Sequence, residues 1–168
     1  GNTGRGESMT RTGAIRGGRV LGPNGAFDER PVCWNDGVLA ESLGDLESGV
    51  DEIVDIDSSH LVLPGIVDLH GDAFERALMP RGGVRFPTGL AMRESEDQLV
   101  AAGITTALLS ATDSWEPGLR SRETLRELVA ALPGFSRVDV LLHVRHEQCN
   151  TEDFDELIGW LRDGTIAL

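Results

Sequence analysis

The feature that most constrains the fold of this chain is a repeated order of apolar strand and amphipathic helix after residue 64. Four runs without internal turn residues are typical of buried strands, at 66–69, 104–111, 138–144 and, where a further one begins, 165–168. Three helical patterns separate these runs, at 93–102, 121–132 and 151–162. Strands that alternate with helices predict a parallel sheet with helices packed outside it, built from βα units of roughly 35 residues.

The ends of the predicted helices carry recognisable capping residues. Ser121 and Thr151 are the predicted N-caps, because their hydroxyl groups can accept hydrogen bonds from the first turn of a helix. Gly103 follows the first helix at the position where a left-handed glycine commonly ends one. In the last helix, four apolar residues recur at the spacing of one helix face: Phe154, Leu157, Ile158 and Leu161.

The residues before this segment have a different pattern, that of short strands joined by turns. The strongest signal is Asn35-Asp36-Gly37 between two short apolar runs, which predicts a β-hairpin. We therefore predict three parts, namely a disordered tail at 1–11, a small β module at 12–63 and the βα units at 64–168. A module of about 50 residues is marginally stable by itself.

The composition excludes several classes of function. The formal net charge of the 168 residues is −13, which argues against nucleic acid or an anionic membrane surface as a partner. The chain has no lysine, so it has no lysine for a phosphate loop, a Schiff base or a metal bridge. No apolar run approaches the roughly 20 residues of a membrane span. Cys33 and Cys149 are isolated, as expected for reduced thiols in a cytoplasmic protein.

His70 and Asp72, at the end of the first apolar strand, are the first candidate site residues. Residues two apart in an extended chain point the same way, so an imidazole and a carboxylate are directed at one point. This pair suits a borderline divalent metal, and Gly71 between them allows a close approach. The same spacing also occurs by chance, and a strand-end histidine is often only a hydrogen-bonded polar residue.

Polar residues also follow the later strands, and the carboxyl ends of parallel strands gather at one edge of a sheet. His143, Arg145 and Glu147 share a face if the third strand extends that far. Glu147 is the predicted carboxylate partner of His70 and Asp72, because a metal bridge in a chain without lysine must come from a carboxylate.

Asp113 and His146 also lie at strand ends, and several of the polar residues there have plainer interpretations. His143 could instead be a buried, hydrogen-bonded core histidine, and Asp113 could be a residue that opens a turn. His146 has the alternatives of a helix cap and of a solvent-exposed residue.

Arg76, Arg81 and Arg85 form the densest basic stretch of this acidic chain, in a segment with Gly82-Gly83 and two prolines. Arginine binds a phosphate group with two donors at once. The stretch is therefore predicted to bind an anionic ligand.

Together these motifs resemble a known family. The stretch LVLPGIVDLH at 61–70, after a hairpin-rich β module, is similar to the opening of the amidohydrolase superfamily of metal-dependent barrel hydrolases. The second histidine of that superfamily's usual His-x-His is Asp72 here. With HGDAFERALMPRGGVRFP, QLVAAGITT and LHVRHE, the chain resembles the diphosphatases of the carbon–phosphorus lyase pathway. That family releases pyrophosphate from alpha-D-ribose 1-methylphosphonate 5-triphosphate.

The resemblance implies a fold, a reaction and a site. The fold is α/β, the N-terminal half of a (β/α)₈ (TIM-type) barrel preceded by a small β module, since a closed barrel needs about 250 residues; an open sheet is the alternative. His70, Asp72 and Glu147 would bind one or two divalent ions, zinc or manganese, with Asp72 and Glu147 as catalytic carboxylates. Four arginines would neutralise the phosphates of a small-molecule substrate: Arg76, Arg81, Arg85 and Arg145. The enzyme would be cytoplasmic.

Two other interpretations stay open. The chain could belong to another amidohydrolase, such as a deaminase or an amide hydrolase, although a neutral substrate has no use for three successive arginines. It could also be an inactive truncated half barrel that binds a partner, as a homo-oligomer or with a complementing C-terminal half. For the isolated chain we expect oligomerisation or aggregation, because a half barrel exposes apolar strand edges.

Overall fold

The computed structural model describes residues 12–42 and 50–168. The chain divides into two compact units, Gly1–Pro64 and Gly65–Leu168, and each is described by itself. The tail predicted at 1–11 lies outside the described residues. Within the described ranges, no helix is long and apolar enough to cross a membrane.

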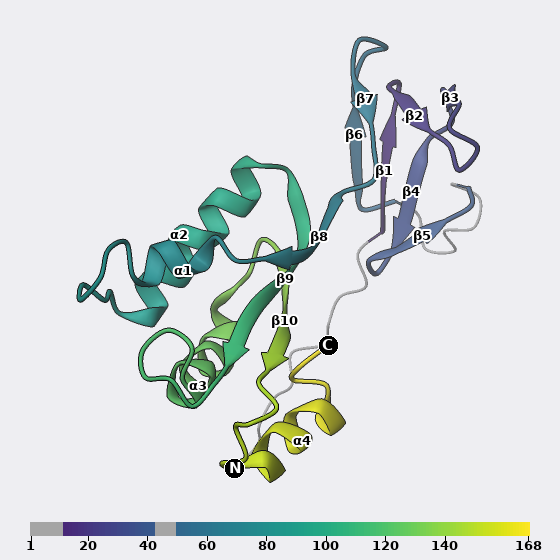
Figure 1. Cartoon of the computed structure of the whole chain (residues 1–168). Coiled ribbons are helices and arrows are strands. Elements are labelled where there is room, and N and C mark those ends of the chain that lie inside the picture. The colour runs from purple at the N-terminus through teal and green to yellow at the C-terminus, as the bar shows by residue number, and fades with distance from the viewer. Residues whose placement is uncertain (1–11, 43–49) are drawn as a thin grey trace, which may run out of the picture. The chain divides into compact units, whose positions relative to one another are not determined.

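The first unit contains two small sheets (Figure 1). One has the strand order β5-β4-β1-β6 and consists of β1 (Thr12–Arg16), β4 (Val32–Asn35), β5 (Val38–Ala40) and β6 (Glu52–Asp55). The other has the order β3-β2-β7 and consists of β2 (Arg19–Leu21), β3 (Phe27–Asp28) and β7 (Leu61–Val62). A small core is formed by Ala14 and Cys33, with Ala40 and Val50 packed against them.

The predicted hairpin at Asp36 and Gly37 is confirmed. β4 and β5 pair antiparallel, with Asn35 opposite Val38 across the turn. Asp36 and Gly37 have φ angles of 49° and 79°, and two positive φ angles are what a two-residue type I′ turn requires. Glycine adopts this backbone freely and aspartate tolerates it, so the local sequence is sufficient to specify the turn.

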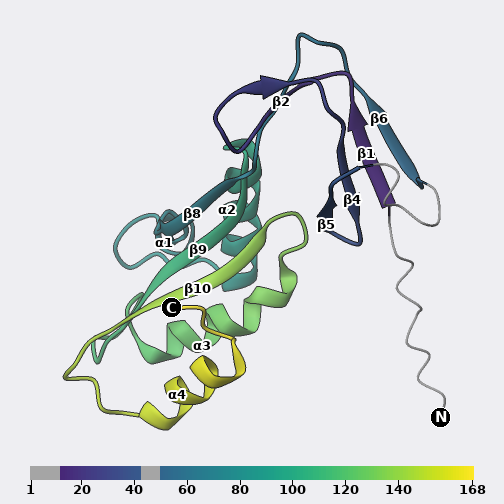
Figure 2. The same ribbon diagram turned by 90° about the vertical axis from the view of Figure 1, so that its right-hand side faces the viewer.

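The second unit contains a three-stranded parallel sheet (Figures 1 and 2). Its strands are β8 (Ile66–Gly71), β9 (Ile104–Asp113) and β10 (Asp139–His146), in the order β10-β9-β8. Both strand pairs run parallel, as the alternation of strands and helices predicted. β9 is central and buried from Ala107 onwards, whereas β8 is an edge strand of this sheet whose register shifts before Gly71.

The helices of this unit are α1 (Phe74–Leu78), α2 (Thr88–Ala101), α3 (Arg122–Ala131) and α4 (Phe154–Asp163), with the 3₁₀ turn η2 (Leu132–Gly134). In both views, α1 and α2 lie on one side of the strands, here called the helix face of the sheet. The core under the helices consists of buried side chains from both strands and helices. They include Leu78, Ala107, Leu109, Ala111, Leu125, Leu128, Leu142 and Leu157.

One predicted helix start is correct and two are wrong. The helix predicted at 93–102 begins at Thr88. Ser121 caps α3, and its side-chain oxygen accepts the backbone N–H of Thr124. Thr151 does not cap α4, because the N-cap is Asp153, which has a φ of 48° and makes no side-chain cap bond. The reason is a tertiary contact, in which Nη1 of Arg122 donates to the carbonyl oxygen of Asp153 at 2.6 Å.

Residues 165–168, where a further strand was predicted to begin, run beside β10 without regular strand structure. Ala167 N–H donates to the Leu142 carbonyl at 3.0 Å, and Val144 N–H donates to the Leu168 carbonyl at 2.8 Å.

Strands and helices alternate along the second unit and its sheet is parallel, so the predicted α/β class is confirmed. Within the described residues the strands form three separate sheets and none closes into a barrel, so the half-barrel arrangement stays a prediction.

Candidate functional site

The candidate site lies near the carboxyl ends of the three parallel strands, on the sheet face opposite the helices. In the strand register, His143 of β10 lies beside Ser110 of β9, and Arg145 lies beside Thr112. The intervening residue Ala111 belongs to the core under the helices. Because side chains alternate between the two faces of a sheet, these four polar residues share the opposite face.

Two histidines meet on this face. The ring centroids of His70 and His143 are 5.2 Å apart, and the ring planes are nearly perpendicular at 81°. Nδ1 of His143 lies 3.2 Å from the carbonyl oxygen of Leu69. A carbonyl oxygen only accepts hydrogen bonds, so this contact assigns a hydrogen to Nδ1 of His143. β9 lies between the two strands, and its small residue Ser110 leaves room for the longer imidazole side chain.

Arg145 adds positive charge to the same face. Its Nη2 donates to the Thr112 hydroxyl at 2.9 Å and lies 4.0 Å from a carboxylate oxygen of Glu75 in α1. With 44% of its side chain exposed, this long ion pair is weak, so the guanidinium can still bind an anion. The neighbouring Ser110 is completely buried, and its hydroxyl has no hydrogen-bond partner among the described residues.

The predicted metal ligands Asp72 and Glu147 directly follow β8 and β10. The carbonyl oxygen of Asp72 accepts the N–H of Glu75 at 3.0 Å, where α1 begins, and the carboxylate of Glu147 accepts the Ser114 hydroxyl at 2.9 Å. In the described part of the chain, no group of three or more His, Cys, Asp or Glu residues is arranged to hold a metal ion. The structure does not assemble His70, Asp72 and Glu147 into the predicted site, and their shared role stays a prediction.

The sequence interpretation missed a buried polar cluster on the helix face, centred on Asp113. The fully buried carboxylate accepts hydrogen bonds from Arg122 at 2.7 and 2.6 Å, from His146 Nδ1 at 2.7 Å and from Asn150 at 3.1 Å. Burial would raise the pKa of Asp113, but the hydrogen bonds from Arg122 and His146 outweigh burial and lower it. Ala111 and Asp113 are two residues apart on β9, so their side chains point to the same side of the sheet. The alternation of side chains along the strand could therefore have predicted that Asp113 lies in the core.

Arg76 and Arg81, predicted to bind phosphate, are both exposed. Arg76 lies on α1 and lines a cavity of about 410 Å³ that also includes Leu90 and Gln98 of α2. Arg81 lies in the loop that follows α1, where its backbone forms a β-bridge with Val84. Their surroundings are compatible with ligand binding, and that role stays a prediction.

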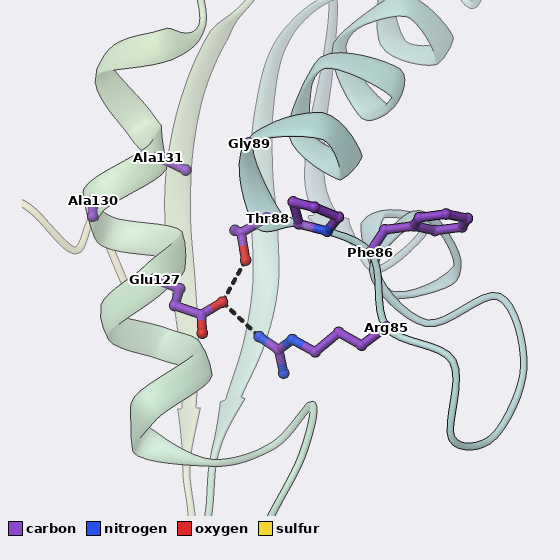
Figure 3. A pocket seen from close by; sticks show the side chains of 8 residues that line it. Arg85, Phe86, Thr88, Gly89, Glu127, Ala130 and Ala131 are labelled. Carbon is purple, nitrogen blue, oxygen red and sulfur yellow. Dashed lines mark hydrogen bonds and ion pairs between the residues drawn. The ribbon is translucent and has the colours of Figure 1, made fainter.

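Arg85 has a different environment, in a cavity of about 710 Å³ between the start of α2 and α3 (Figure 3). Its guanidinium donates to Glu127 at 2.6 Å and to the Thr124 hydroxyl at 2.9 Å. Thr88 donates to the same Glu127 carboxylate, and the hydrogen bonds from Thr88 and Arg85 lower its pKa despite partial burial. The lining of the cavity contains no strand-end residue, so the contacts of Arg85 favour a structural role over the predicted role in substrate binding, which the structure does not test.

The chain is similar in sequence to one known enzyme and in structure to another. No protein-family model matches the chain. Over 108 residues, it is 32% identical to alpha-D-ribose 1-methylphosphonate 5-triphosphate diphosphatase of Escherichia coli (strain K12), a match that covers 60% of this chain and 28% of the relative. A prolidase solved in complex with N-methylphosphonate-L-proline superposes with a TM-score of 0.45 and 17% identity, over 80% of this chain and 32% of its own.

The chain thus spans less than a third of the length of either protein. The similarity to the diphosphatase extends over more than half of this chain, far beyond any single motif. The predicted resemblance to the diphosphatase of the carbon–phosphorus lyase pathway is therefore confirmed at the level of sequence.

Proposed function

We propose that this chain is part of a hydrolase of phosphonate catabolism that acts on a ribose triphosphate. The observation that carries the proposal is the 32% identity with the Escherichia coli diphosphatase. In the proposed reaction, water attacks the α-phosphorus of alpha-D-ribose 1-methylphosphonate 5-triphosphate and the α–β anhydride bond breaks. The ribose keeps a 5-phosphate and pyrophosphate leaves.

Binding such a substrate requires local positive charge, since the formal net charge of the chain is −13. Arg145 supplies it on the sheet face where His70 and His143 meet. Arg76 and Arg81 are exposed in the segment that directly follows β8. We assign to these three arginines the neutralisation of the phosphoryl oxygens, because fixed donors stabilise the charge that develops during phosphoryl transfer.

The proposed enzyme requires a divalent metal, zinc or manganese, and the donor chemistry of the site is suitable for one. His70 and His143 offer imidazole nitrogens, which are common ligands of zinc. A bound ion would supply Lewis-acid polarisation of a phosphoryl oxygen. Asp72 and Glu147 are the proposed carboxylates that accept or return a proton at the strand ends, and the Ser114 hydroxyl orients Glu147.

The test is isothermal titration of the purified chain with alpha-D-ribose 1-methylphosphonate 5-triphosphate, with zinc or manganese added, because the matched segment is only 28% of the relative. We expect binding that weakens at least about ten-fold when Arg145 is replaced by Ala, because one charge-assisted contact is lost. The matched control is Arg30→Ala, an exposed arginine of the first unit that pairs with Asp28. No binding with either metal, or equal affinity for ATP, would refute the proposal.

A second candidate is a chain that binds a second copy of itself along the edge of its sheet. Three apolar side chains of the edge strand β8 are exposed, Ile66 by 54%, Val67 by 55% and Leu69 by 63%. Edge strands with exposed apolar residues commonly pair with another chain. Light scattering of the purified chain at several concentrations tests this candidate, and a monodisperse monomer at all of them would contradict it.

A further inference from the structure

We propose that a cavity on the helix face of the parallel sheet binds a primary ammonium ion with a short apolar body, through the carboxylate of Asp68. The cavity has a volume of about 250 Å³ and is lined by residues of β8, α1, α2 and β9. It is separate from the proposed triphosphate site, because that site uses Arg145 on the opposite face of the sheet.

The strand register directs Asp68 toward this cavity. Asp68 of β8 pairs with Ala107 of β9, and Ala107 belongs to the core under the helices. The side chains of paired residues lie on the same face of a sheet, so the Asp68 carboxylate also lies on the helix face. A charged side chain in the middle of this strand is therefore partly buried beside apolar residues of the helices.

The carboxylate of Asp68 has one oxygen without a partner. Its Oδ1 accepts the backbone N–H of His70 at 3.0 Å. Among the described residues, no group donates a hydrogen bond to Oδ2, and Asp68 forms no ion pair. A carboxylate partly removed from water is stable when a cation balances its charge. Since no basic side chain of the described residues lines the cavity, a ligand has to supply that cation.

A β-bulge keeps the approach to Oδ2 open. Asp68 pairs with Ala107 and Gly71 pairs with Leu109, so β8 takes three steps where β9 takes two. Bulges commonly redirect a side chain next to a binding site. A Cβ atom at Gly71 would lie 2.8 Å from Oδ2 of Asp68, so only glycine leaves the space beside this oxygen empty.

The other groups of the cavity define the class of ligand. Ser95 and Gln98 already donate their side-chain hydrogens, to the Ala91 carbonyl at 2.9 Å and to Glu94 at 3.0 Å, which leaves their oxygens as acceptors. Three acceptors suit a primary ammonium group, which has three N–H donors.

The remaining walls are apolar and come from Phe74, Leu99, Ile104 and Leu109. They fit a hydrocarbon body that a bare metal cation does not have. At about 30 Å³ for each water-sized group, the cavity has room for about eight non-hydrogen atoms. A phosphorylated ligand is excluded, because Asp68 would repel it.

The first experiment records ¹H–¹⁵N NMR spectra of the isotope-labelled chain during titration with n-pentylammonium chloride. We expect saturable shifts of the backbone amide signals of Gly71, Ser95 and Leu99. The neutral analogue pentan-1-ol should bind at least about ten-fold more weakly, because it lacks the charge-assisted contact. This comparison uses the unmodified chain and so does not depend on the folding of any variant.

A further titration identifies the source of the ammonium group. The chain has no lysine, so a second copy cannot supply one. Nα-acetyl-lysine methylamide represents the lysine of another protein, and we expect it to bind at least about ten-fold more weakly than n-pentylammonium, since the cavity is small. Binding at least as tight as that of n-pentylammonium would overturn the assignment to a free amine.

The second experiment repeats the n-pentylammonium titration with variants. Asp68→Asn keeps the shape of the side chain but removes its charge, and Gly71→Ala places a methyl group against Oδ2. Each should weaken binding at least about ten-fold. The matched control is Asp139→Asn, an exposed carboxylate at the start of β10, which should bind as the unmodified chain does.

Four results would overturn the inference. They are the absence of saturable shifts, equal affinity for pentan-1-ol, equal affinity for potassium ion at the same amide signals, and binding that is retained in Asp68→Asn.

Discussion

Replacing Glu96 by Gln tests how the second unit joins α2 to the turn before β10. Glu96 is 4% exposed, and its Oε1 accepts the backbone N–H groups of Ser136 at 2.8 Å and Arg137 at 2.7 Å. The guanidinium of Arg137 lies 3.2 Å from Oε2. Gln keeps the shape and an acceptor oxygen but loses the charge, so the substitution isolates the charge-assisted part of these hydrogen bonds.

The expected loss follows from the two backbone hydrogen bonds. Each contributes about 1.5–3 kcal/mol with a charged acceptor and about 0.5–1.5 kcal/mol with a neutral one. Glu96→Gln should therefore lower the free energy of unfolding by about 2 kcal/mol at pH 7. The side chain of Arg137 is 48% exposed, so its ion pair adds less than about 1 kcal/mol.

The effect should depend on pH in a defined direction. The backbone hydrogen bond from Arg137, followed by that from Ser136, outweighs burial and lowers the pKa of Glu96 from 4.5 to about 2. A lowered pKa in the folded state stabilises the protein above pH 4.5, and this contribution disappears as the pH falls toward 2. The unmodified chain should thus lose its advantage over Glu96→Gln across that range.

Urea denaturation followed by circular dichroism, at pH 7 and at several lower values, measures both quantities. The matched control is Glu94→Gln, an exposed residue of the same helix that bonds only to Gln98, and it should change the stability by less than about 0.5 kcal/mol. If Glu96→Gln matches the unmodified chain at pH 7, or if the difference persists unchanged at the acid end, the reasoning is refuted.

Three further substitutions separate structural from ligand-binding charges. Arg81→Ala should keep the free energy of unfolding within about 0.5 kcal/mol but weaken triphosphate binding in isothermal titration, since the residue is exposed; a larger loss of stability would contradict the proposed role. Asp113→Asn should cost about 3–5 kcal/mol in urea denaturation, because it leaves Arg122 buried without its counter-charge; a cost under about 1 kcal/mol would argue against the buried pair. Arg85→Gln should cost only about 1 kcal/mol or less, since 29% of Arg85 and 41% of Glu127 are exposed, and should leave triphosphate affinity unchanged; a weakened affinity would return Arg85 to the substrate site.

The sequence predicted those parts of the fold that local chemistry determines. Asp36-Gly37 specifies its own turn, Ser121 caps the helix next to it, and the apolar runs mark the strands of the parallel sheet. Thr151 failed as a cap because the start of α4 is set by Arg122, a residue 31 positions away from Asp153 along the chain. Helix α1 was missed because five residues are too few to show a helical period.

The candidate site was only partly predictable for a related reason. The sequence places His70, Arg145 and Glu147 near strand ends, but it does not state which strand lies in the middle of the sheet. The order β10-β9-β8 puts β9 between the candidates and makes the size of Ser110 decisive for the contact between His70 and His143. Asp113 was placed among the polar residues at the strand ends, with a turn residue as the alternative, and neither interpretation predicted that its carboxylate is buried.

The position of Arg122 has a consequence for how the second unit opens. Its guanidinium is shared by β9, through Asp113, and by the residue before α4, through the carbonyl oxygen of Asp153. Short helices at the surface of a domain usually fray alone, with a low free energy of local opening. Here the detachment of α4 would take a hydrogen-bond acceptor from a buried cation, so its backbone amides should exchange hydrogen in step with those of α3 and β9.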